Sequence, residues 1–134
     1  MQEKKNTAFA RVHISFDGRV KKWFLGPNAK ERFSNEVQVL KYLEKKRCTF
    51  VPRLLAKYDS ELKIETTNCG QMLQRLSEDK CQALFKELET FGVLHGDQAV
   101  RNITYEANLG RFCIIDFEFA TILEEGYDPV IPLF

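Results

Sequence analysis

The sequence predicts an α+β fold in which strands dominate the first half of the chain and helices the second. Three observations support this prediction. Residues 11–16 alternate strictly between polar and apolar side chains, and residues 28–46 and 77–91 each carry an apolar stripe at helical spacing. We therefore expect a small antiparallel sheet of four or five strands with one helix, followed by a reduced helical part.

The first predicted strands form a hairpin. In residues 11–16, RVHISF, every second side chain is apolar, so that these side chains, Phe16 among them, share one half-buried face. Asp17-Gly18 supplies the turn, because glycine accepts a positive φ without a Cβ clash, and residues 19–25 return as the second strand.

Two further short strands are expected in residues 54–67, LLAKYDSELKIETT, after which Gly70 breaks the chain. We place an internal boundary at this glycine. At 134 residues the chain fits a single minimal domain, with a first lobe of about residues 1–69 and a second lobe of about residues 70–134.

Each predicted helix has a clear apolar face. Ser77 is a suitable N-cap for the second helix, and Gly92 a suitable stop after it. The stripe of the first helix consists of Phe33, Val37, Leu40 and Leu43, and that of the second of Cys81, Leu84, Phe85 and Leu88.

Composition gives little indication of a partner. The 20 basic and 19 acidic residues leave a formal charge of +1, so that no bulk field favours nucleic acid or a membrane surface. The four cysteines, Cys48, Cys69, Cys81 and Cys113, are widely spaced and suit neither a zinc site nor a disulfide framework. We expect reduced thiols in a cytoplasmic protein without a signal peptide or a membrane span.

Residues 94–118, LHGDQAVRNITYEANLGRFCIIDFE, contain two groups of polar residues, each of which follows apolar residues. The first group is His95, Asp97 and Asn102, and the second is Asp116. Phosphoryl transfer from a nucleotide needs a group that receives the proton of the attacking hydroxyl, together with oxygen ligands for magnesium. Asp97 followed five residues later by Asn102 supplies a base and one ligand, and Asp116 supplies another. These groups converge if residues 112–115 pair back beside residues 103–105 across the turn at Asn108-Leu109-Gly110.

The arrangement His-x-Asp-x-x-x-x-Asn, followed by an apolar strand and Ile-Asp-Phe, resembles the catalytic loop and metal motif of the protein-kinase-like superfamily. The resemblance implies a two-lobed fold with a strongly reduced second lobe, and ATP with Mg²⁺ as cofactors. It implies that Asp97 is catalytic, that Asn102 and Asp116 hold the metal, and that His95 is structural.

The resemblance extends into the first lobe, where the family uses a strand lysine held by a helix glutamate. The segment VKKWF contains Lys21 and Lys22, and Glu36 follows in the predicted helix. A strict two-residue hairpin turn favours Lys21 on the inner face, whereas a bulged turn favours Lys22. The family pattern Val-x-Lys, with Val20 against adenine, selects Lys22.

The departures from the family bear on the acceptor. No glycine-rich loop precedes the first strand, and 16 residues follow Glu118, so that we expect the usual substrate-binding subdomain to be missing. The sequences HGD, with Gly96, and IDFE, with Glu118, resemble lipopolysaccharide kinases, the small kinase of the tRNA-threonylcarbamoyl complex, and the aminoglycoside and choline phosphotransferases. AVRN, ending at Asn102, resembles the catalytic loop of tyrosine kinases.

Three functions are compatible with these motifs. The first choice is a minimal ATP-dependent kinase that phosphorylates a hydroxyl of a protein, because all the nucleotide-handling positions are present. The second is a small-molecule phosphotransferase, and the third a nucleotide-binding adaptor without catalytic activity. A partner protein that completes the missing part of the second lobe is a further expectation.

Overall fold

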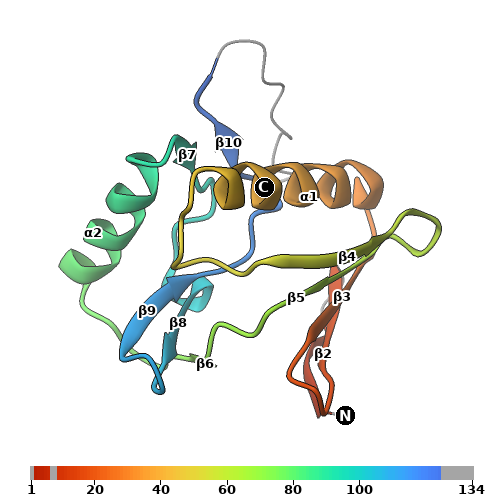
Figure 1. The fold of residues 1–134 in the computed structure, drawn as a ribbon, viewed down its shortest axis with the longest axis horizontal. Helices are drawn as coiled ribbons and strands as arrows, with labels where there is room; N and C mark the ends of the chain where they lie inside the picture. Colours follow the sequence, from red (N-terminus) through yellow and green to blue (C-terminus); the bar gives the residue numbers. More distant parts are fainter. Residues whose placement is uncertain (1, 7–8, 125–134) are drawn as a thin grey trace.

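The computed structural model describes the backbone of residues 2–6 and both backbone and side chains of residues 9–124. It is a mixed α+β structure with a five-stranded antiparallel sheet, two smaller sheets and two α-helices in this part of the chain. In Figure 1 the long helix α1 lies across the large sheet. The helix α2 lies beside β7 at the left of the view, on the side of the molecule away from the large sheet.

The five-stranded sheet contains the first five strands in the order β1-β2-β3-β5-β4. Their bounds are Gln2–Asn6 (β1), Ala10–Ile14 (β2), Val20–Phe24 (β3), Leu54–Tyr58 (β4) and Lys63–Thr66 (β5). A 3₁₀ turn at Asp59–Glu61 joins β4 to β5, and every neighbouring pair is antiparallel.

The helix α1 spans Ala29–Lys45 and contacts β3, β4 and β5. It forms because its apolar residues recur every three or four positions, so that Phe33, Val37, Leu40 and Leu43 are all buried.

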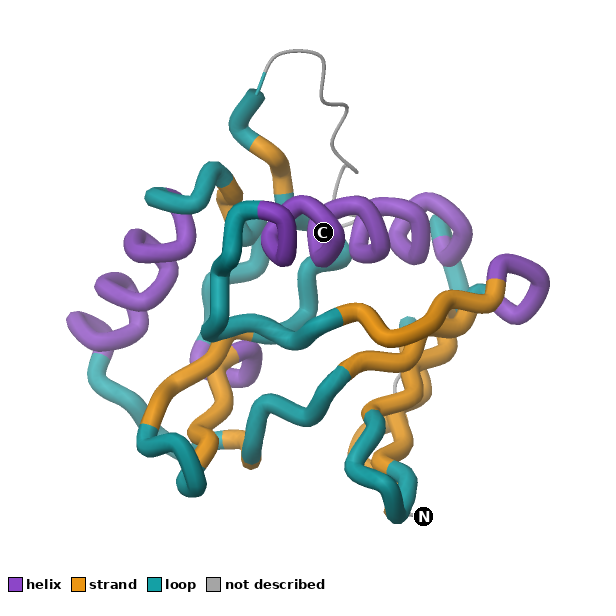
Figure 2. Tube along the Cα trace, in the orientation of Figure 1, coloured by secondary structure: helices purple, strands orange, loops and turns teal. Residues whose placement is uncertain are grey.

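The second half of the chain contains the helix α2 at Glu78–Glu89 and a 3₁₀ turn at Val100–Asn102. Its strands are Gln71–Met72 (β6), Val93–Leu94 (β7), Ile103–Glu106 (β8), Arg111–Ile114 (β9) and Thr121–Ile122 (β10). Strands β6, β8 and β9 form one small sheet, and β7 pairs with β10. In Figure 2 the sheet of β6, β8 and β9 lies between α2 and the large sheet, whereas β7 and β10 lie at the top of the view.

The local signals for α2 and the β8–β9 hairpin are those expected from the sequence. The Ser77 hydroxyl accepts a hydrogen bond from the Lys80 backbone N–H at 3.2 Å, and Gly92 beyond the helix has a φ of 88°. Ile103 pairs with Ile114 across a turn that ends at Gly110, as predicted.

One apolar cluster joins the two halves of the chain. It includes Leu40 and Leu43 of α1 as well as Phe85 and Leu88 of α2. All four cysteines are free thiols, and three of them are buried. None of the helices among the described residues is both long and apolar enough to cross a membrane.

The structure corrects the predicted first hairpin. The strand ends at Ile14 rather than at Phe16, and the side chain of Phe16 is 97% exposed instead of sharing the buried face. Five residues, Ser15–Arg19, separate the paired residues Ile14 and Val20, so that the connection is longer than the two-residue turn expected at Asp17-Gly18. Strands β1, β6, β7 and β10 have no counterpart in the sequence prediction.

Candidate functional site

The register of the first hairpin determines which of the two lysines, Lys21 or Lys22, points toward the interior of the protein. Val12 pairs with Lys22 and His13 with Lys21, and side chains alternate between the two faces of a strand. Lys22 is 8% exposed and lies on the same face as the half-buried Val20, whereas Lys21 lies on the opposite face. The longer connection therefore buries the lysine that the bulged-turn alternative selects.

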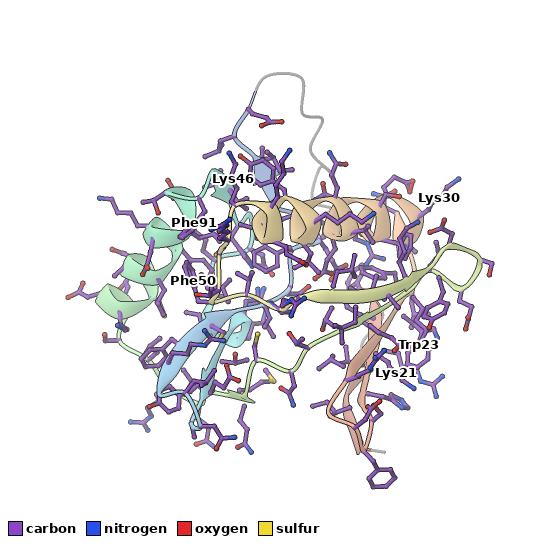
Figure 3. All side chains as sticks on the ribbon, in the orientation of Figure 1. Lys21, Trp23, Lys30, Lys46, Phe50 and Phe91 are labelled. Atoms are coloured by element: carbon purple, nitrogen blue, oxygen red, sulfur yellow. The ribbon has the colours of Figure 1, made fainter. Side chains whose placement is uncertain are left out.

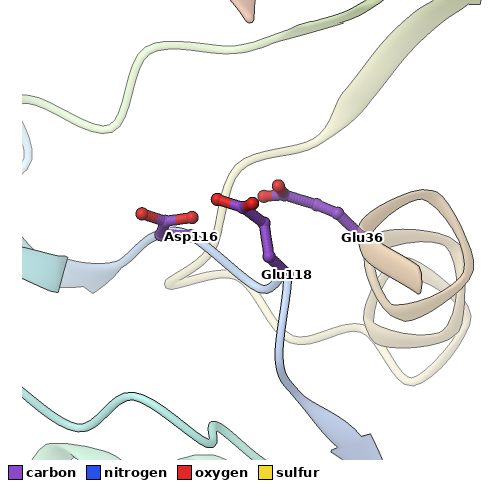
Figure 4. A group of neighbouring side chains, drawn as sticks. All are labelled: Glu36, Asp116 and Glu118. Atoms are coloured by element: carbon purple, nitrogen blue, oxygen red, sulfur yellow. The ribbon is translucent and has the colours of Figure 1, made fainter. Parts of the chain in front are cut away.

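The ammonium group of Lys22 lies among three carboxylates. Its Nζ is 2.8 Å from Glu36 Oε1, 2.8 Å from Asp116 Oδ1 and 2.9 Å from Glu118 Oε2. Figure 4 shows these carboxylates facing one another, from α1 and from the segment after β9. They lie close enough together to hold a cation, and the side chain of Lys22 is that cation here.

Electrostatics keep Lys22 charged. Burial alone lowers the pKa of its ammonium group, but the charges of Asp116, Glu36 and Glu118 outweigh burial and hold that pKa well above its usual range. The second oxygen of Glu36 accepts a hydrogen bond from the Phe117 backbone N–H at 3.1 Å. Glu36 thus fixes both the lysine and the segment that carries Asp116.

The carboxylates outnumber the cations that neutralise them. Arg32, whose side chain is fully buried, lies 2.5 Å from Glu118 Oε1, so that two cations face three acids. Burial raises the pKa of the Glu118 carboxyl to about 7; the Lys22 charge opposes this rise, and the Asp116 charge adds to it. Near neutral pH, Glu118 is therefore the group whose proton removes the surplus negative charge.

Sequence reasoning missed three residues of this cluster: Arg32, Asn35 and Glu118, which was noted only as a departure from the family pattern. Arg32 also donates to the carbonyl oxygens of Pro27, Phe9 and Leu25. The Asn35 amide donates to the carbonyl oxygens of Glu118 and Ala120, each at 2.9 Å. A signal was available, because positions 32, 35 and 36 continue the spacing of the buried residues 39, 40 and 43.

Asp97 and Asn102 meet in the loop between β7 and β8. The Asn102 side-chain amide donates to the Asp97 backbone oxygen at 2.9 Å and to its carboxylate at 3.1 Å. Arg101 Nη2 contacts both carboxylate oxygens of Asp97, at 2.6 and 2.8 Å. The carboxylate of Asp97 is thus oriented by an amide and neutralised by a guanidinium group.

His95 connects this loop to the segment that carries Asp116. Its Nδ1 accepts from the Asp97 backbone N–H at 3.2 Å, so that Nε2 carries the proton and donates to the Ile115 carbonyl at 2.9 Å. The fully buried ring lies between Phe85 and Phe117, and burial lowers the pKa of His95. The predicted structural role of this histidine agrees with these contacts.

A backbone hydrogen bond brings Asn102 next to the segment that carries Asp116. The N–H of Ile115 donates to the carbonyl oxygen of Asn102 at 2.9 Å. Among the described residues, Asn102 Oδ1 is the one buried side-chain oxygen or nitrogen without a hydrogen-bond partner. Asp116 has a φ of 72°, a conformation that costs free energy in a residue other than glycine. An amide oxygen and a carboxylate are ligands that suit Mg²⁺, so that the residues present fit this metal.

Gly96 occupies a position without room for a side chain. A Cβ atom there would lie 2.1 Å from the Phe119 carbonyl oxygen, and the φ of Gly96 is 86°. The sequence HGD, rather than a sequence with arginine at its centre, is therefore required by the close approach of residues 96 and 119.

The structure brings the predicted site residues together in two groups, which backbone contacts connect. One contains Lys22, Glu36 and Asp116, with Val20 on the lysine's face, and the other contains Asp97 and Asn102. Comparisons with protein-family models and with curated proteins found no match to this chain.

Proposed function

We propose that this chain is an ATP- and Mg²⁺-dependent phosphotransferase of the protein-kinase-like type, acting on a hydroxyl group of a protein. The observation that carries the proposal is the position of Lys22 Nζ, 2.8 Å from both Glu36 and Asp116. A lysine fixed in this way presents its charge where nucleotide phosphates would lie beside a metal-binding carboxylate.

Each residue has one role in this proposal. Lys22 binds phosphate oxygens, Glu36 orients Lys22, and Val20 contacts the adenine. Asn102 and Asp116 hold Mg²⁺, which neutralises charge on the phosphates when it is bound.

Asp97 then receives the proton of the acceptor hydroxyl. For Asp97 to do this, one carboxylate oxygen has to exchange its contact with Arg101 for the acceptor, and the 54% exposure of the Arg101 side chain allows that movement.

One observation favours a small-molecule acceptor as the second candidate. The sequence IDFE resembles that of the small-molecule phosphotransferases, and its last residue, Glu118, is part of the site and contacts Lys22 directly. A nucleotide-binding adaptor is the third candidate, because Lys22 already has three carboxylate partners in the absence of nucleotide.

Calorimetry of MgATP binding tests the shared premise. Asp116→Ala removes an anionic metal ligand and should weaken MgATP binding about tenfold or more, by analogy with the loss of groups around other metal sites. Asp97→Ala removes the acceptor-side carboxylate but keeps the backbone oxygen that holds the Asn102 amide, so that MgATP still binds while phosphoryl transfer stops. Asp59→Ala is the matched control, because the side chain of Asp59 is 71% exposed in the β4–β5 turn.

Equal MgATP affinity in the two site variants, or binding by the parent that does not depend on magnesium, would contradict the proposed metal site. The acceptor is tested separately with labelled ATP. Label recovered on protein hydroxyls supports the protein kinase, and transfer only to added small alcohols supports the second candidate. MgATP binding without any transfer supports the adaptor.

A further inference from the structure

The face of the large sheet opposite Lys22 carries a row of alternating cations and aromatic rings. Arg11 of β2 pairs with Trp23 of β3, Trp23 pairs with Lys63 of β5, and Lys63 pairs with Tyr58 of β4. Because directly paired residues share a face, the four side chains form one line across four strands. We call Arg11, Trp23, Lys63 and Tyr58 the cation–aromatic row.

The charged groups of this row lie over its rings. Arg11 Cζ is 5.6 Å from the centroid of the Trp23 ring, and Lys63 Nζ is 5.1 Å from it. Lys63 Nζ is also 4.7 Å from the centroid of the Tyr58 ring. These are cation–π distances, and a cation–π contact by itself does not neutralise the charge of the cation.

The next row of the same face contains charges of both signs. It contains His13, Lys21 and Glu65, which are paired across β2, β3 and β5. Glu65 is shared between Arg19 at 3.2 Å and Lys63 at 3.5 Å. Glu3 of β1 pairs with His13 and therefore belongs to the same face. At the described strand positions of this face, Arg11, Lys21 and Lys63 thus face two carboxylates, which leaves one positive charge in excess.

The face is open to solvent at Arg11 and Tyr58, is more closed at Lys63, whose side chain is 14% exposed, and lies away from the candidate site. Tyr58 is 39% exposed, Arg11 is exposed, and Trp23 and Lys21 are half-buried. Figure 3 shows Lys21 and Trp23 close together on the strands, whereas Lys30 lies on α1. Lys22 and Phe24 lie on the opposite side of the same strand, toward the interior.

We propose that this face binds single-stranded nucleic acid. Proteins bind single strands by combining cations that track the phosphates with aromatic rings on which bases stack, and the cation–aromatic row provides both in alternation. An acidic peptide would use the cations but leave the two rings without flat partners. A double helix is a poorer fit, because its bases are already stacked and cannot lie on the rings.

Binding would exchange one set of contacts for another. In the free protein Arg11 and Lys63 lie over Trp23 and Tyr58, and phosphates would draw these cations from the rings as bases take their place. The ion pairs that form release condensed counterions, which makes the exchange favourable at low salt. The formal charge of +1 for the whole chain conceals this surface, because acidic residues elsewhere cancel it.

The test uses the single tryptophan of the chain, which belongs to the row. Oligouridine and oligothymidine of about 12 nucleotides, within the usual site size, are titrated while Trp23 fluorescence and the anisotropy of an end-labelled strand are recorded. We expect quenching of Trp23 in parallel with binding. With three phosphate contacts, the affinity should fall about 20-fold between about 50 and 200 mM salt. Binding of either polymer supports the proposal, and their ratio shows whether RNA or DNA is preferred.

Variants locate the surface. Arg11→Gln/Lys63→Gln removes two phosphate contacts and should reduce the salt dependence to about a third, since that dependence is proportional to the number of contacts. Lys30→Gln/Lys41→Gln removes the same charge from exposed positions of α1 and should leave affinity and quenching unchanged. Lys21→Gln, outside the cation–π contacts, should weaken binding even if the double variant of the row fails to fold.

Three outcomes would overturn the proposal: no saturable binding at low salt, equal loss of affinity in the row and α1 variants, or binding without a change in Trp23 fluorescence. Polyglutamate of equal charge that competes as well as oligouridine would also overturn it, because the surface would then bind polyanions in general. The measurement contains no nucleotide triphosphate or magnesium, so that its result is independent of the proposed phosphotransferase.

Discussion

Lys22 and Asp116 meet with 2.8 Å between Nζ and Oδ1 although 94 residues separate them in the chain. One comes from the middle of a strand in the large sheet and the other from a strained turn after β9. Glu36 of α1 accepts hydrogen bonds from both sides of this contact: from Lys22 Nζ and from the backbone N–H of Phe117, the residue after Asp116. A substitution at this junction should therefore affect stability as well as binding.

Lys22→Met tests how far the cluster depends on its ammonium group. The sequence alone suggests that this change leaves folding nearly intact, but the structure shows that it leaves three carboxylates with only Arg32. We expect a loss of about 3 kcal/mol in the free energy of unfolding, together with loss of phosphoryl transfer. Urea denaturation and a transfer assay measure the two effects.

Lys21→Met is the matched control for Lys22→Met, because Lys21 lies on the opposite face of the same strand. It should change the free energy of unfolding by no more than about 0.5 kcal/mol and leave transfer intact. If Lys21→Met abolishes transfer and Lys22→Met does not, the assignment of the phosphate-binding lysine is wrong.

Glu118 should make stability depend on pH. Its pKa is about 7 in the folded chain against an ordinary value of 4.5, so that between these pH values the folded chain holds a proton that the unfolded chain has lost. The stability contributed by this group is complete below pH 4.5 and is lost as the pH rises to about 7. The loss is at most about 3 kcal/mol.

Glu118→Gln removes this titration. The free energy of unfolding of the parent relative to the variant should decline between pH 4.5 and 8, as measured by urea denaturation at a series of pH values. Parallel pH profiles for the two proteins would show that Glu118 stays ionised beside Arg32 throughout this range.

Gly96→Ala should be strongly destabilising because of the Phe119 carbonyl. Its control is Gly18→Ala, since Gly18 has a similar φ of 84° but nothing within 4 Å of an added Cβ. The left-handed conformation alone costs about 1–2 kcal/mol, and we expect Gly96→Ala to exceed the control by at least about 2 kcal/mol. Equal melting temperatures for the two variants would mean that residues 117–120 move aside without cost.

Asn102→Ala should weaken the effect of magnesium on ATP binding without changing ATP binding in the absence of magnesium. The change removes the unpartnered Oδ1 and the amide that orients Asp97. The gain in ATP affinity on addition of magnesium should fall about tenfold, while affinity without magnesium stays the same. Asn108→Ala, at an exposed turn position, is the control. A full magnesium effect in Asn102→Ala would exclude the Asn102 side chain as a ligand.

The sequence predicted the parts of the fold in which local patterns are strong. The helices at Ala29–Lys45 and Glu78–Glu89, the Ser77 cap and the β8–β9 hairpin all follow from spacing and turn chemistry, and all are confirmed. The two-residue strands β6, β7 and β10 are too short to carry any period, which explains why they were missed.

Around the candidate site, sequence reasoning worked for side chains in spaced motifs and failed for those buried by tertiary contacts. The positions of Lys22, Glu36 and Asp116 agree with the predicted convergence, although their roles remain predictions. Arg32 was not singled out from the sequence, because only the folded chain brings the carbonyl oxygens of Pro27 and Phe9 to its guanidinium group. Phe16 was misplaced because a five-residue connection and a tight turn have similar local sequences.

The long sequence separation between Lys22 and its two partners near residue 117 also has a consequence for the order of folding. The large sheet and α1 are encoded by the first half of the chain, but the contacts of Lys22 with Asp116 and Glu118 span 94 and 96 residues. Contacts of such high sequence separation tend to form late, because closing a long loop costs chain entropy before the contact contributes any stability. During synthesis, an emerging chain would carry the lysine and the glutamate of α1 long before it carried their partners. The nucleotide site proposed here would therefore come into existence only at the end of folding, and a truncated product would not compete for nucleotide.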